Sequence, residues 1–196
     1  MKPKIAAKRI FLPLCASLAL SACVSTTKSK VSVDYYSISG NSTAALDREI
    51  RNKGPRINGG RHAVAVARIK IIPNVRYNTV DGLCRVAYAK VAVNARVTLP
   101  RWRERKNANK KLGEAWDNID RYTRLHESVH VAIAFRYAND LERALNELSP
   151  NSSCSTLKGH VSDIVSSRLD EHDVTQKKFD ADEQRKFALL ARKRDT

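Results

Sequence analysis

The chain has 196 residues, enough for one ordinary domain once any targeting segment is removed. It carries 36 Lys and Arg against 20 Asp and Glu, a formal net charge of +16. Such a basic excess can serve nucleic acid, anionic lipid or anionic cell-wall polymer, but the sequence holds no recognition-helix or aromatic stacking motif. We therefore expect no nucleic-acid partner.

The first 22 residues have the layout of a bacterial lipoprotein signal peptide. A basic start is followed by an apolar segment from Ile10 to Leu20, which is too short to span a bilayer. The Leu-Ser-Ala sequence directly before Cys23 resembles the lipobox, in which the cysteine is acylated, with palmitate among its chains, and becomes the first residue of the mature protein. Val24 rather than Asp after it favours the outer membrane, facing the periplasm. An uncleaved membrane anchor is the alternative.

The predicted mature chain divides into a tether and one domain. Loss of residues 1–22 removes four positive charges and no acidic one, so the net charge falls from +16 to +12. Residues 23–32 are small, polar and basic, which is typical of a flexible tether between a lipid and a domain. A single domain is then expected over residues 33–196. In the cell envelope its basic surface meets lipid headgroups, lipopolysaccharide and peptidoglycan carboxylates first.

The four cysteines predict one disulfide. Cys15 is lost with the signal peptide and Cys23 carries lipid, so Cys84 and Cys154 remain as a pair in an oxidising compartment. A structural zinc site would need closely spaced Cys or His ligands at each half, which this pair lacks. We expect a disulfide between Cys84 and Cys154.

The first half of the domain is expected to form a small sheet. Residues 34–38 read as a short strand, and residues 42–52 as a helix capped by Asn41 or Ser42. Alternating apolar residues predict strands over 62–77 and 84–99, joined by a turn at 78–82. We expect Pro100 to end the sheet, and residues 102–111 to form a charged connection.

The second half is expected to form two long helices. Apolar residues recur every three or four positions from Trp116 to Leu148, which predicts a helix that ends before Pro150. A second helix from near Ser155 keeps that spacing to Phe179, and the two should pack antiparallel about a hinge near residue 152. The predicted class is α+β, a small mainly antiparallel sheet packed against these two helices, with the strand order left open.

The strongest chemical signal is the sequence His126-Glu127-Ser128-Val129-His130 within the first long helix. Two histidines four residues apart project from adjacent turns of one face and can share a zinc ion. Glu127 is then placed to act on a zinc-bound water as general base and then as general acid. We therefore expect the domain over residues 33–196 to be zincin-like. Ile133 and Arg136 stand where the metzincin pattern requires Gly and His, which excludes that class.

The third metal ligand must come from another element. With the helices antiparallel about residue 152, the position level with His126 and His130 is near residue 176. His172 lies on the inward stripe at about that level, and we favour it as the third ligand. Asp180 and Glu183 are the alternatives. The remaining histidines, His62 and His160, lie far from this level, and we expect neither to be a ligand.

These residues also carry a resemblance to a bacterial family known as domain of unknown function 922, whose members are described as predicted secreted zinc-dependent proteases. The matching positions run over nearly all of the mature chain: residues 35–40, 46–47, 54–55 and 99–102, Cys84, Trp116, His126-Glu127-x-x-His130 and Cys154. The resemblance implies a secreted metallohydrolase with one Zn²⁺ per chain and a pair of bonded cysteines.

One stretch departs from the family pattern. The family reads Tyr-Asp-x-x-Thr-x-His-Gly downstream, and here residues 179–185 keep the Asp as Asp180 but replace the Thr and the late His. If the late His binds metal in the family, this chain uses His172, Asp180 or Glu183 in its place, or it has lost catalysis. If Asp180 is the third ligand, this chain keeps the complete ligand set of the family.

Two functions follow from the sequence. The first is an envelope-anchored zinc-dependent hydrolase, a peptidase acting on a peptide, protein or peptidoglycan-linked substrate. The alternative is a non-catalytic envelope lipoprotein of the same fold that binds cell-wall polymer or a protein partner.

Overall fold

The computed structural model describes residues 28–57 and 60–194. The predicted signal peptide and the predicted lipidation site, Cys23, lie outside these described residues. The described elements follow the order β1 (Lys30–Ile38), α1 (Thr43–Lys53), β2 (Val66–Val80), β3 (Leu83–Trp102), a short 3-10 turn η1 (Arg105–Asn107), α2 (Lys110–Asn146) and α3 (Cys154–Arg194).

The three strands form one sheet in the order β1-β3-β2. β2 and β3 are the arms of a long antiparallel hairpin, while β1 pairs parallel to β3 on its other side. Asp81 and Gly82 form the two-residue hairpin turn, with φ of 51° and 74°. An Asp-Gly pair suits this turn because both positions need the left-handed conformation.

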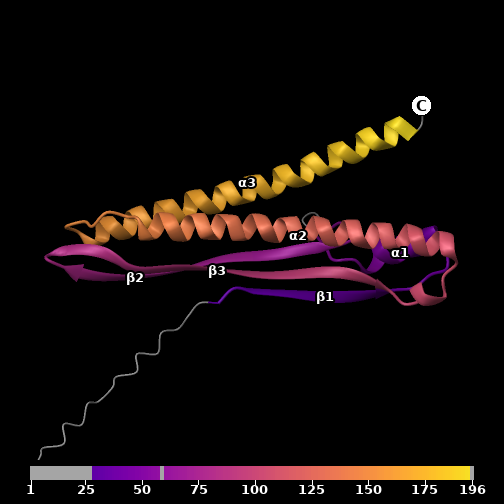
Figure 1. Cartoon of the computed structure of the whole chain (residues 1–196), viewed down its shortest axis with the longest axis horizontal. Helices are drawn as coiled ribbons and strands as arrows, with labels where there is room; N and C mark the ends of the chain where they lie inside the picture. Colours follow the sequence, from indigo (N-terminus) through magenta and orange to yellow (C-terminus); the bar gives the residue numbers. More distant parts are fainter. Residues whose placement is uncertain (1–27, 58–59, 195–196) are drawn as a thin grey trace, which may run out of the picture.

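The long helices α2 and α3 run antiparallel on the same side of the sheet, and α3 diverges from α2 toward its C-terminal end (Figure 1). The main hydrophobic cluster fills the space between β3 and α2, and α3 joins it through Val161. Its fully buried members include Val93 from the sheet and Leu141 and Leu145 from α2. The α+β prediction, with a small sheet packed against two long helices, is confirmed.

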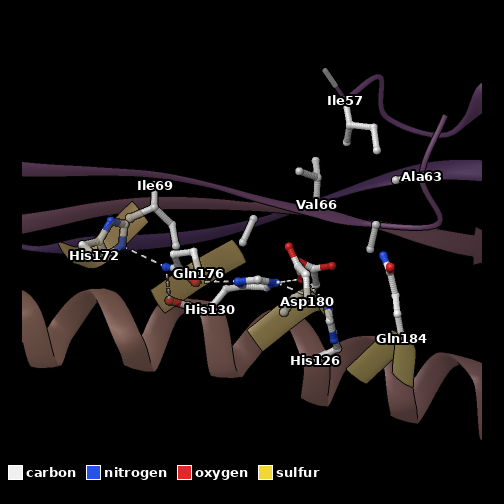
Figure 2. Close-up of a pocket in the computed structure, with 13 residues that line it drawn as sticks. Ile57, Ala63, Val66, Ile69, His126, His130, His172, Gln176, Asp180 and Gln184 are labelled. Atoms are coloured by element: carbon white, nitrogen blue, oxygen red, sulfur yellow. Dashed lines mark hydrogen bonds and ion pairs between the residues drawn. The ribbon is translucent and has the colours of Figure 1, made fainter. Parts of the chain in front are cut away.

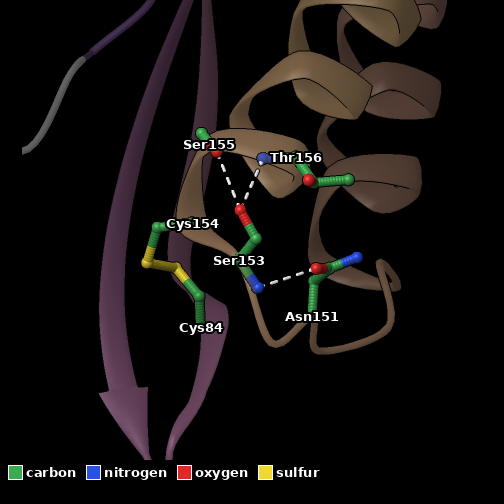
Figure 3. Close-up of a disulfide and its surroundings, with 6 residues drawn as sticks. All are labelled: Cys84, Asn151, Ser153, Cys154, Ser155 and Thr156. Atoms are coloured by element: carbon green, nitrogen blue, oxygen red, sulfur yellow. Dashed lines mark hydrogen bonds between the residues drawn. A yellow bond between two sulfur atoms is a disulfide. The ribbon is translucent and has the colours of Figure 1, made fainter.

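The end of the molecule where α2 turns into α3 is closed covalently. Cys84 at the start of β3 is bonded to Cys154 at the start of α3, as predicted (Figure 3). Asn151 in the turn exchanges two backbone hydrogen bonds with Cys84, of 2.7 and 2.9 Å. The turn thereby forms an isolated antiparallel bridge with the start of β3.

Several boundaries differ from the sequence-based expectation. The strand expected over 62–77 runs from Val66 to Val80, because the turn is confined to Asp81 and Gly82. β1 begins at Lys30, inside the segment 23–32 that we expected as a tether, because residues 30–32 already pair with β3. Pro100 does not end the sheet. β3 continues to Trp102 through its pairing with β1. Its pairing with β2 ends at Thr98, so Pro100 faces no strand on that side and its missing N–H leaves no hydrogen bond of the sheet unmade there.

The start of the first long helix also differs. α2 begins at Lys110 rather than near Trp116, because the Asn109 side chain accepts a hydrogen bond from the Leu112 N–H and caps the helix. Among the described residues, no helix combines the length and the hydropathy that a membrane crossing requires.

Candidate metal centre

Helix α2 places the His-Glu-x-x-His residues against both the sheet and α3. Glu127 belongs to the buried stripe of α2, between Thr123 and Ala134, so its side chain turns toward the sheet. His126 and His130 flank this stripe and turn toward α3, since neighbouring positions on a helix differ by about 100°. One turn of α2 therefore presents two imidazoles and a carboxyl group to the same space.

Asp180 of α3 completes the group. Its Oδ1 lies 3.3 Å from His126 Nε2 and 3.0 Å from His130 Nε2, and the two Nε2 atoms are 3.2 Å apart (Figure 2). Zinc bonds of 2.0 to 2.2 Å in tetrahedral directions set donor atoms roughly 3.3 Å apart. The three donor atoms therefore have the spacing of one face of a zinc tetrahedron, and the group can hold a metal ion.

Glu127 is buried beside this group, with 6 % of its surface exposed. Burial raises the pKa of its carboxyl group, while the neighbouring His130 and the Ala67 backbone N–H, which donates to the carboxylate, act in the opposite direction. A carboxyl group with a raised pKa accepts a proton more readily than an exposed one, which is the property required of a general base.

His126 is held in the form that binds metal. Burial and the neighbouring His130 lower the pKa of its imidazole, with Asp180 and Glu183 opposing them. The neutral ring is therefore favoured, and only an unprotonated nitrogen can bind a cation.

Gln176 of α3 fixes the orientation of His130. Its amide N–H donates to the His130 carbonyl oxygen at 3.0 Å, and since a carbonyl can only accept, the amide orientation is determined. The Gln176 Oε1 must then accept from His130 Nδ1–H, at 2.6 Å. This leaves the His130 Nε2 lone pair directed at His126 and Asp180, as in metal sites whose histidines are oriented by outer hydrogen bonds.

His172, the third ligand favoured from the sequence, is not brought into the group. It is buried on α3, where its Nε2 accepts the second amide hydrogen of Gln176 at 2.8 Å and its Nδ1 donates to Asp173. His172 therefore lies behind Gln176, as the next member of a hydrogen-bonded chain that ends at His130. The structure places Asp180, one of the two alternatives, at the third position.

The other candidates lie outside the group. Glu183 accepts a hydrogen bond from Tyr122 at 2.7 Å and pairs with Lys186. His62 Nδ1 lies 2.7 Å from the Gly54 carbonyl oxygen, and His160 is exposed on α3. Among the described residues, the group that could hold a metal ion consists of His126, His130 and Asp180.

Two adjoining pockets, of about 440 and 340 Å³, open onto the group. Both include His126, Glu127 and Asp180. The segment before and at the start of β2 forms a wall of the larger pocket, and Val64 and Ala65, just before β2, line the smaller one. Neither is lined by Lys or Arg among the described residues. The ionisable lining is histidine and carboxylate, with Tyr122 in the smaller pocket, so the Lys and Arg side chains lie elsewhere.

The comparison with protein families matches residues 33–187 to the model for a bacterial protein of unknown function (DUF922). The chain belongs to the DUF922 family. The resemblance seen in the sequence is thereby confirmed, although the family description names no activity. The curated proteins and the solved structures contain no match to this DUF922 protein.

The residue that the sequence did not reveal is Gln176. Glutamine is an ordinary helix residue, and nothing in its type marks it as part of a site. The one signal was its register, since residue 176 is the position expected to lie level with the two histidines.

Proposed function

We propose that this protein is a zinc-dependent hydrolase of the bacterial cell envelope, acting as a peptidase. The observation that carries the proposal is the spacing of the three donor atoms on His126, His130 and Asp180, with Glu127 buried beside them. Two histidines and one carboxylate form a donor set that catalytic zinc sites use, and it leaves a fourth position for water or substrate.

Zinc bound here would polarise the scissile carbonyl group and lower the pKa of a water molecule in the pocket. Glu127 would take a proton from that water as the water oxygen attacks the carbonyl carbon. The same carboxyl group then gives the proton to the leaving nitrogen as the C–N bond breaks. His130 remains oriented throughout by Gln176, and the start of β2 forms the wall along which an extended peptide can lie.

The experiment is zinc analysis and a hydrolysis assay on residues 24–196, with fluorophore-labelled casein as substrate. Among the described residues, the buried apolar side chains lie between Ile38 and Val161, so this chain keeps the core. We expect near one zinc per chain in the wild type and loss of zinc in Asp180→Ala. Glu127→Gln should keep zinc and lose roughly 10²- to 10⁴-fold in rate.

Glu147→Gln, the same chemical change at the exposed C-terminal end of α2, is the matched control and should leave zinc and rate unchanged. Hydrolysis retained in Glu127→Gln would refute the role of Glu127. No zinc after reconstitution would refute the enzyme proposal and leave the non-catalytic envelope lipoprotein.

Attachment to the envelope is the second part of the proposal, through lipid on Cys23 in the outer membrane, facing the periplasm. It is supported by the basic, apolar and small-residue order of residues 1–23. Labelled palmitate should enter the wild type and Cys15→Ser, but not Cys23→Ser. Labelling that persists in Cys23→Ser would contradict the anchor.

A further inference from the structure

The face of the sheet that points away from α2 and α3 carries a basic patch over all three strands. Along residues 68–75 of β2 and 89–96 of β3, before the register shift at Arg76/Tyr77, the odd-numbered residues belong to or pack against the hydrophobic cluster, and the even-numbered residues lie on the opposite face. The even-numbered residues at the start of β1 share that opposite face, because they pair with even-numbered residues of β3. Six of these even-numbered residues surround a hollow of about 420 Å³. We call these six residues the basic face: Lys30, Ser32, Arg68, Lys70, Asn94 and Arg96. Four of these six side chains are cationic, and all four residues are exposed.

The positive charges on this face are opposed by little negative charge. Arg96 lies 3.5 Å from Asp34, a pair in which both side chains are mainly exposed. Arg68 donates a hydrogen bond to the backbone carbonyl oxygen of Arg56, and a carbonyl group carries no charge that could neutralise the guanidinium. Over the described residues, no ion pair involves Lys30, Arg68 or Lys70. The basic face therefore keeps an excess of positive charge that an outside anion can neutralise.

The register makes this arrangement unfavourable for the isolated domain. Arg68 stands directly opposite Arg96 in the antiparallel ladder, and like charges in that relation are destabilising. Lys70 stands opposite Asn94, which in turn stands opposite Lys30. An anionic surface laid across the three strands would remove the repulsion by neutralising neighbouring cations together.

The basic face also lies where the described chain begins. Lys30 is both the first residue of β1 and part of this face, and Lys28 just before it is exposed. A fully extended chain from Cys23 to Lys30 spans at most roughly 25 Å. A lipid on Cys23 would therefore hold the basic face close to the membrane surface.

We propose that the basic face is a docking surface for anionic phospholipid headgroups, which holds the sheet against the membrane and turns the metal centre away from it. The choice of occupant rests on the proposed attachment through Cys23. Polybasic surfaces near a lipid anchor bind anionic membranes through the combined attraction of several cations, and this attraction weakens as salt is added.

The test is sedimentation of residues 24–196 with vesicles of phosphatidylcholine alone or mixed with phosphatidylglycerol, at low and physiological salt. We expect binding only to the anionic vesicles, and stronger binding at low salt. Arg68→Gln with Lys70→Gln should weaken it by about tenfold or more. Lys110→Gln with Lys111→Gln, which removes two exposed cations at the start of α2, should weaken it far less.

Equal losses in the two double variants would show an effect of net charge and overturn the docking surface. Absence of binding to anionic vesicles at low salt would also overturn it. Binding to a short DNA duplex that depends on Arg68 and Lys70, without binding to vesicles, would replace lipid by another polyanion. Zinc content of the Arg68 and Lys70 variant should equal that of the wild type, which separates this test from that of the metal centre.

Discussion

The two ends of the α2–α3 pair are held together in different ways. At the hinge, the Cys84–Cys154 disulfide (Figure 3) and the backbone hydrogen bonds between Asn151 and Cys84 join the helices to the sheet. Farther from the hinge α3 diverges from α2 (Figure 1). At the far end of the segment over which the two helices contact each other, near the middle of α2, polar groups connect them: Asp180 with the two histidines, and Glu183 with Tyr122. The hinge is covalent, whereas the far end depends on groups that a metal ion would organise.

This difference indicates that the hinge stabilises the fold and that the far end forms the candidate metal site. The hinge sets the register of α3 along α2, so that Gln176 arrives level with His130. The contacts of α3 with the main hydrophobic cluster lie toward the hinge, at Val161, Ile164 and Val165. At the far end, the ring of Phe179 packs against the rings of the two site histidines. We therefore expect stability to depend on the hinge and metal affinity to depend on the far end.

Removal of the disulfide should have the largest effect on stability. The bond closes a loop with a sequence separation of 70, for which the chain-entropy model gives about 4 kcal/mol. Cys84→Ser with Cys154→Ser should lower the free energy of unfolding by about that amount in denaturant titrations. Zinc per folded chain should stay near the wild-type value, because Asp180 is separated from the hinge by roughly 40 Å of helix. Equal loss of zinc would show that the two ends are not independent.

Substitution of Gln176 should affect the far end selectively. Gln176→Leu removes the acceptor of His130 Nδ1–H and both donated bonds, so zinc affinity should fall roughly 10- to 100-fold. Competition with a chromogenic chelator measures this change. Lys177→Leu, on the exposed neighbouring position, is the matched control and should keep wild-type affinity. A similar fall in both variants would point to α3 as a whole rather than to the hydrogen bonds of Gln176.

The smallest effects should come from two tyrosines that bridge α2 and α3. Tyr122 donates to Glu183 at the far end, and Tyr137 bonds to Thr175 nearer the hinge, both at 2.7 Å. Each change to Phe should cost about 1 kcal/mol in thermal unfolding. Hydrogen exchange should increase around Glu183 only in Tyr122→Phe. Increased exchange at Cys154 in that variant would contradict the separation of the two ends.

Local patterns predicted much of this fold. The three-to-four spacing fixed the two long helices, and the alternation around Ile69 and Val91 fixed the hairpin. The parallel pairing of β1 with β3 was beyond reach, because it depends on contacts between segments about 60 residues apart. The tolerance of Pro100 inside β3 depends on the same pairing and could not be read locally.

The site shows the same limit at the scale of one helix. The motif gave His126, Glu127 and His130, and the antiparallel arrangement gave the level on α3. Whether His172 or Asp180 meets them depends on how α3 is rotated and tilted against α2. Tertiary packing determines that rotation. In this structure it places Gln176 in hydrogen-bond contact with His130 and Asp180 beside the two histidines.

The hinge has a further consequence for ligand exchange. Two histidines on one helix are neighbours in any helical state of the chain, but the carboxylate comes from a second helix and would otherwise be a separate ligand. Because the chain itself joins the two helices through the turn between them, Asp180 is presented at an effective concentration that a dissolved carboxylate would not reach. Metal binding by the two histidines would then be completed by Asp180 from the same chain, and release of the ion would require the bond to Asp180 to open first.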